Sequence, residues 1–125
     1  LVLSLAVRYP VSITENEVTT QLTKALFPES EVTVIRRLPS TLFPKDERNV
    51  QKLTKVYEQI TGLDGTPVTT TGATYARFMP NIVAFGPSFP GQKGIAHNQD
   101  EYMDEKDLLL NLEIYMQAMI ALTEA

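Results

Sequence analysis

The longest stretch of helical apolar spacing lies near the C-terminal end of the sequence, after Asp104. Apolar side chains recur there three and four positions apart, which is the spacing of one face of an α-helix. This face consists of Leu108, Leu109, Leu112, Tyr115, Met116, Met119 and Leu122. Asp104 is the predicted N-cap of the helix. With 43% of its 125 residues hydrophobic, the chain also has enough apolar material for the core of one domain.

Two earlier helices are predicted from the residues at their ends. Thr14 and Glu17 have the spacing of a capping box, and the helix that they begin should end before Pro28. Asp46 is the predicted N-cap of the next helix, and Gly62 is its predicted C-terminal stop. The apolar face of that helix consists of Val50, Leu53, Tyr57 and Ile60.

Apolar runs outside the helices predict β-strands. Residues 1–9 alternate, which places one face in a core; that face consists of Leu1, Leu3, Leu5 and Val7. Residues 31–38, 67–71 and 82–85 are further predicted strands. The order strand, helix, strand at the N-terminal end indicates an α/β unit with mixed α+β character. The proline-containing residues 39–44 are the predicted linker or domain boundary.

Composition excludes several classes of function. A net charge of -4 argues against a protein that binds nucleic acid through a basic surface. No run of about 18 apolar residues is present, so no membrane-spanning helix is expected. The absence of cysteine excludes disulfides and thiolate metal sites, and it fits a cytoplasmic protein. Because the sequence starts inside a predicted strand without an initiator methionine, we expect it to be a piece of a longer chain.

Three features are candidates for chemistry, and each also has an ordinary structural explanation. His97 is the only histidine, beside Asp100 and Glu101; it is either a metal ligand or a loop residue before a helix. Arg8, at a strand end, either binds a carboxylate or is solvated. The small residues 70–74 either let a ligand approach the backbone or form a turn. A dinucleotide fingerprint, a P-loop and a catalytic triad are all missing.

The segments taken together resemble the M20 metallopeptidase family, most closely its bacterial dipeptidases of the PepV type. Residues 69–103, TTTGATYARFMPNIVAFGPSFPGQKGIAHNQDEYM, are similar to the family's GGTYAR-like loop, apolar strand, F-P-G loop and H-x-x-D/N-E motif before a final helix. Residues 44–62, PKDERNVQKLTKVYEQITG, resemble a family helix. Residues 7–11, VRYPV, resemble a strand end of its lid domain. The resemblance covers essentially the whole chain.

The resemblance implies a fold and a place for each segment. In these enzymes a lid domain interrupts a catalytic α/β domain, and two zinc ions lie in the cleft between them. Residues 1–40 would be the C-terminal part of the lid domain, and residues 41–125 the C-terminal part of the catalytic domain. The rest of the polypeptide, N-terminal to this chain, would then be its main partner.

The resemblance also implies roles for individual residues. His97 would be a ligand of one zinc ion, and Arg8 would bind the C-terminal carboxylate of a dipeptide. The loop lining the substrate site would comprise Gly72, Ala73 and Thr74, with Arg77 nearby. Ala73 departs from the family pattern, which has a second glycine there, so its methyl group would narrow the approach to the backbone.

The expected function is therefore part of a zinc-dependent dipeptidase. The other zinc ligands and the general-base glutamate lie outside these residues in the family, so the chain alone is expected to be inactive and to self-associate through uncovered apolar surface. Two alternatives stay open. One is a standalone, non-catalytic α/β module, and the other is an M20 aminoacylase or deacetylase acting on N-acyl amino acids.

Overall fold

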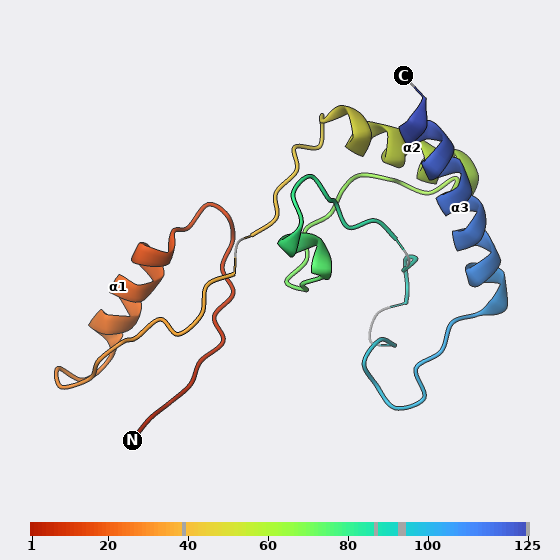
Figure 1. The fold of residues 1–125 in the computed structure, drawn as a ribbon. Helices are drawn as coiled ribbons and strands as arrows, with labels where there is room; N and C mark the ends of the chain where they lie inside the picture. Colours follow the sequence, from red (N-terminus) through yellow and green to blue (C-terminus); the bar gives the residue numbers. More distant parts are fainter. Residues whose placement is uncertain (39, 87, 93–94, 125) are drawn as a thin grey trace. The chain divides into compact units, whose positions relative to one another are not determined.

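The computed structural model describes residues 1–38, 40–86, 88–92 and 95–124. Three α-helices and one 3-10 helix follow one another along these ranges (Figure 1). The helices are α1 (Glu15–Ala25), α2 (Arg48–Thr61), η1 (Tyr75–Phe78) and α3 (Glu105–Thr123). The chain divides into two compact units. Unit 1 comprises Leu1–Leu42 and Thr70–Ile82, and unit 2 comprises Phe43–Thr69 and Val83–Ala125.

Helix α1 belongs to unit 1 and begins where the sequence predicts. The hydroxyl of Thr14 accepts the Glu17 N–H at 3.3 Å, and the Glu17 carboxylate accepts the Thr14 N–H at 2.7 Å, which completes the predicted capping box. Arg37 donates from Nε to both carboxylate oxygens of Glu15, at 2.7 and 2.8 Å, and so attaches residues 31–38 to the first turn. No residue of α1 is buried.

The sequence predicts strands at residues 1–9, 31–38, 67–71 and 82–85, and this prediction is wrong for the described residues. No strand forms among the described residues, and these segments have no ladder partners. The predicted buried face of the first segment is wrong for this chain, because Leu3 and Leu5 are 73% and 62% exposed. A strand is stabilised by hydrogen bonds to a neighbouring strand, and alternation in one segment does not supply that neighbour.

Unit 2 contains the core of the chain. Helices α2 and α3 pack side by side (Figure 1). The buried side chains of this core are Leu53, Val56, Ile114 and Ala118. The two helices run antiparallel, because Lys52 in the first turns of α2 donates from Nζ to the carbonyls of Ala121 and Glu124 at the end of α3, at 2.7 and 2.6 Å. This places a cation at the C-terminal end of a helix, where the helix dipole favours it.

The structure corrects the predicted start of α2 and confirms its predicted end. Glu47, not Asp46, is the N-cap of α2, and its carboxylate accepts the N–H groups of Asn49 and Val50, each at 3.0 Å. The correction follows from geometry, because only a residue directly before the first turn can reach those donors. Gly62 ends α2 in the left-handed conformation, with φ 68°, as predicted.

Asp104 occupies the N-cap position of α3, as predicted, but its side chain accepts no capping hydrogen bond. Among the residues predicted as linker, Pro39 lies outside the described ranges. Pro87 and the pair Lys93 and Gly94, in the predicted F-P-G loop region, lie outside them as well. The prediction of a domain boundary at residue 40 concerns the longer family fold and stays a prediction.

Candidate functional site

Arg8 contacts the small-residue loop in unit 1. Its guanidinium Nη1 donates to the backbone carbonyl of Thr71, 63 residues along the chain, and its side chain is otherwise exposed. Thr71 directly precedes the three predicted substrate-binding residues Gly72, Ala73 and Thr74. The structure thus brings together two predicted elements of the substrate site, the arginine and the loop.

The loop itself is shaped by two threonine hydroxyls. Thr70 Oγ1 accepts the Gly72 N–H at 3.0 Å, and Thr74 Oγ1 accepts the Ala76 N–H at 3.2 Å at the start of η1. A Cβ atom added at Gly72 would lie 3.2 Å from Thr70 Oγ1, which is tighter than ordinary van der Waals contact. Glycine at this position therefore lets the Thr70 hydroxyl close over the backbone.

Arg77 also belongs to the predicted substrate-binding residues. It lies in η1 and is half-buried. Its Nη2 donates to the carbonyl of Leu38 at 3.4 Å, at the end of the extended segment 31–38. Arg8 and Arg77 therefore attach the segment 71–77 to the N-terminal part of the chain at both ends. This gives Arg77 a structural contact of its own, beside its predicted place near the substrate.

His97 lies in unit 2, in the loop before α3. Its backbone N–H donates to Glu101 Oε2 at 3.1 Å, and its side chain is exposed. Both His97 and Asp100 have positive φ, 63° and 60°, a conformation that few residues with a Cβ adopt. Asp100 and Glu101 precede α3, whose acidic first-turn residues are Glu105 and Asp107. Glu101 holds the His97 backbone.

A complete metal centre is not formed by the described residues. Within those ranges, no three His, Cys, Asp or Glu side chains lie close enough together to hold an ion. The imidazole of His97 is of the right chemical type for zinc, but it accounts for one ligand of the three or four that zinc takes. Among the described residues, His97 is therefore a candidate ligand without the further ligands that a zinc ion takes.

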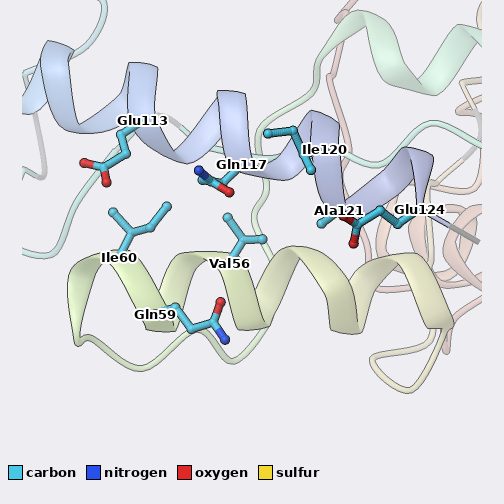
Figure 2. A pocket seen from close by; sticks show the side chains of 8 residues that line it. All are labelled: Val56, Gln59, Ile60, Glu113, Gln117, Ile120, Ala121 and Glu124. Atoms are coloured by element: carbon cyan, nitrogen blue, oxygen red, sulfur yellow. The ribbon is translucent and has the colours of Figure 1, made fainter.

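The groove between α2 and α3 is a separate feature of unit 2 (Figure 2). It has a volume of about 320 Å³, and Val56 and Ile60 from α2 face Gln117 and Ile120 from α3 across it. Glu113 and Glu124 add carboxylates to its rim. None of the site residues predicted from the sequence lines this groove, and it is a gap between packed helices.

Sequence reasoning missed three contacts near the site residues. The carbonyl of Thr71 receives Arg8, Gln92 donates from Nε2 to Asp107 Oδ2 at 2.5 Å, and the Tyr115 hydroxyl donates to the carbonyl of Phe85 at 3.1 Å. The partners are 15 to 63 residues apart in the chain. No spacing rule links residues at such separations, so only the folded chain reveals them.

Comparison with known proteins gives a family for these elements. Residues 5–121 match the model of the peptidase family M20/M25/M40. The chain belongs to this family. Peptidases of the family generally depend on metal ions, and membership is consistent with an α/β fold. No solved structure gives a significant match.

Two curated relatives illustrate the similarity. The chain is 42% identical over 79 residues to "Putative dipeptidase YtjP" of Bacillus subtilis, a match covering 63% of this chain and 17% of that protein. It is 38% identical over 81 residues to Beta-Ala-Xaa dipeptidase of Lactobacillus delbrueckii subsp. lactis, covering 65% of this chain and 17% of that protein. The chain thus spans about a fifth of the length of its relatives or less. Their names support a dipeptidase-type function at the level of the family.

Proposed function

We propose that this chain is part of a metal-dependent dipeptidase, in which it binds the free carboxylate of the substrate and supplies one metal ligand. The observation that carries the proposal is the contact between Arg8 and the carbonyl of Thr71, in a chain that belongs to a peptidase family and resembles dipeptidases. It brings a cation and a loop of small residues together within one compact unit, as a site for the end of a short peptide requires.

Arg8 is the residue proposed to select the substrate. A guanidinium has five N–H donors in a planar fork, which matches the two oxygens of a carboxylate. Within the described ranges its acceptor is the carbonyl of Thr71, and the side chain is exposed, so donors remain for a ligand. The backbone of Gly72, Ala73 and Thr74 would lie along the bound dipeptide, and Arg77 would keep that segment in place through Leu38.

His97 is the proposed metal ligand. Zinc, two ions per active site in the complete enzyme, would lower the pKa of a bound water and polarise the scissile carbonyl. Within this chain, Glu101 fixes the backbone at His97 by accepting its N–H, which restricts the positions that the imidazole can reach. No residue of this chain is proposed as the general base.

The remainder of a longer polypeptide is the proposed partner of this chain. Helix α3 packs on α2 with one side only, and many of its other apolar residues stay exposed; they include Leu108, Leu109, Leu112, Met116 and Met119. A helix that is apolar around most of its circumference is normally buried on more than one side. We expect the isolated chain to self-associate through this surface, and sedimentation analysis of Leu109→Lys beside the unchanged chain tests that expectation.

We also propose that the complete enzyme is cytoplasmic. None of the helices in the described ranges combines the length and apolar content needed to cross a bilayer. The absence of cysteine in the sequence adds to the proposal of a cytoplasmic enzyme.

The proposal is tested with the complete reading frame that contains this chain. Arg8→Gln should raise KM at least tenfold for dipeptides with a free carboxylate, because a charge-assisted pair is lost. It should change little for the same dipeptides with an amidated C-terminus. His97→Ala should lower both bound zinc and kcat. An unchanged zinc content in His97→Ala, or equal losses on both substrates in Arg8→Gln, would contradict the proposal.

The 125-residue chain serves as a second arm of that experiment. It should hydrolyse no dipeptide with or without added zinc, because its described residues form no complete metal centre. Faster hydrolysis of N-acyl amino acids than of dipeptides by the complete protein would favour an aminoacylase instead. Such substrates also end in a free carboxylate, so the Arg8 result alone does not separate these two activities.

A further inference from the structure

The loop that carries His97 is closed at its base by one side-chain pair. Gln92 donates from Nε2 to Asp107 Oδ2 at 2.5 Å, and both side chains are half-buried. Gln92 Oε1 also accepts the Phe89 N–H at 2.9 Å. Asp107 lies in the first turn of α3. The two partners are 15 positions apart in the sequence, and their hydrogen bond links the two ends of the interval in addition to the chain itself.

The segment leading to Gln92 is itself attached to the helices of unit 2. The ring of Phe89 stacks on Tyr57 of α2 with centroids 6.4 Å apart, and the ring of Phe85 meets Tyr115 of α3 edge-on at 6.1 Å. The Tyr115 hydroxyl donates to the Phe85 carbonyl. Both phenylalanines pack against the buried core. Gln92 therefore joins an anchored segment on one side to a regular helix on the other.

The contact at Phe85 also requires glycine next in the chain. Gly86 has φ 73°, and a Cβ atom at this residue would overlap the Tyr115 hydroxyl oxygen. A side chain at residue 86 would thus displace Tyr115 from the Phe85 carbonyl. The anchoring on this side of the loop depends on close packing as well as on hydrogen bonds.

We infer that Gln92 is a positioning residue for His97. It acts through Asp107 and fixes where the loop leaves the packed part of unit 2 and where it returns at α3. This inference rests on the proposed role of His97 and adds a residue that holds it. A site residue on a loop reaches a reproducible geometry only when neighbouring contacts restrain the loop. Without this pair, only the packing of Phe89 and of α3 would hold the ends of the interval, so the loop would gain conformational freedom at its base.

The chemistry of the pair explains why the residue is an amide. Gln92 accepts from a backbone N–H with one atom and donates to a carboxylate with the other. A glutamate could accept but not donate, and it would place a second negative charge beside Asp107. A lysine could donate but not accept. Among side chains of this length, only an amide satisfies both partners.

The test exchanges the donor and acceptor of the pair in the 125-residue chain. Gln92→Glu should break the bond. The double variant Gln92→Glu with Asp107→Asn should restore it, because the amide introduced at position 107 then donates to the carboxylate introduced at position 92. Gln99→Glu is the matched control: it adds the same charge within the loop, at an exposed residue. Because His97 is the only histidine, its imidazole Hε1 proton gives a resonance that belongs to this residue alone and can be followed by NMR.

The expected result is specific to the loop. In Gln92→Glu the His97 amide should exchange about tenfold faster, and its imidazole resonance should broaden or split. The control and the double variant should stay within about twofold of the unchanged chain, and exchange in the middle of α2 should be the same in all four proteins. Unchanged His97 signals in Gln92→Glu, or failure of the double variant to restore them, would overturn the inference.

A second readout separates this inference from the proposed function. In the complete enzyme, Gln92→Glu should lower kcat while leaving KM within about twofold, because Arg8 and its loop belong to the other unit. The double variant should recover kcat. If His97→Ala keeps its zinc, the proposed function fails, whereas the NMR result on the loop still stands. If the His97 signals never respond to Gln92, the inference fails and the zinc result is unaffected.

Discussion

Each of the two compact units of this chain is stabilised internally by a different kind of contact. In unit 2, α2 and α3 bury a cluster of aliphatic side chains at their interface. In unit 1, α1 buries no residue, and the described contacts that join distant segments are made by Arg8, Arg37 and Arg77. Local signals suffice to begin and end a helix, but a core requires a second apolar surface to pack against. Among its described residues, unit 1 has the local helix signals but no buried apolar cluster.

The same difference separates the two parts of the candidate site. Arg8 and the glycine loop are joined by a guanidinium–carbonyl bond in an exposed setting, where water competes for both partners. The segment before the His97 loop is joined to α2 and α3 by stacked rings, a tyrosine–carbonyl bond and a half-buried amide–carboxylate bond. We therefore expect mutations to affect the two units with different magnitudes, and the following predictions test this.

The largest effect is expected from Leu53→Ala. Leu53 is 7% exposed and clusters with Ile114 and Ala118, so its truncation should cost about 3 kcal/mol of the unfolding free energy of unit 2. The matched control is Leu22→Ala in α1. Leu22 is half-buried and no residue of α1 is buried, so this change should lower the unfolding free energy by less than about 1 kcal/mol. Hydrogen exchange measured separately in α2 and α1 distinguishes the two. Equal losses at both sites would show that unit 1 has a core too.

An intermediate effect is expected from Lys52→Met. This change keeps an apolar stem but removes the two hydrogen bonds to the carbonyls at the end of α3, and it should cost about 1 to 2 kcal/mol. Lys55→Met, at an exposed position of the same helix, is the control and should be nearly neutral. Urea unfolding monitored by circular dichroism measures both. If the two variants lose equal stability, the ammonium at residue 52 does not act through the α3 carbonyls.

The smallest effect concerns the pH dependence of α1. The hydrogen bonds from the backbone N–H and then the hydroxyl of Thr14 lower the pKa of Glu17 from its ordinary value of 4.5. A carboxyl whose pKa is lower in the folded state stabilises that state above pH 4.5, and this contribution is lost as pH falls through the lowered value. The Cα chemical shifts of α1 should therefore report less helix on acidification.

Glu17→Gln tests the origin of that pH dependence. The amide keeps an acceptor for Thr14 but does not titrate, so the first turn of α1 should lose most of its response between about pH 6 and pH 3. Helix α2 has the carboxylate of Glu47 at its N-cap and serves as an internal reference in the same spectra. An identical response of α1 in both proteins would assign the effect to other carboxylates.

The helices were the part of the fold that could be read from the sequence. Thr14 and Glu17 form the predicted capping box, and Gly62 ends α2 in the left-handed conformation. Each signal works within a few residues, which is why it survives in a short chain. The N-cap of α2 was placed one residue early, at Asp46, because two acidic residues stand side by side and only geometry shows which one reaches the free N–H groups.

The candidate site could be predicted only as a set of residues. The family resemblance selected His97, Arg8 and the glycine loop, and the structure adds the contact between the last two. Gln92 was not selected, because an isolated glutamine carries no signal of its own. Its partner, Asp107, looks like an ordinary acidic residue in the first turn of a helix.

By itself, the sequence located the three α-helices and, to within one residue, their starts, because capping and periodicity act between residues close along the chain. The tertiary structure decided which segments meet: Arg8 with Thr71, Gln92 with Asp107, and Lys52 with the end of α3. It also decided that the four predicted strands have no ladder partners among the described residues. The physical reason is that alternation specifies the two faces of a strand, whereas its stability comes from hydrogen bonds to another segment.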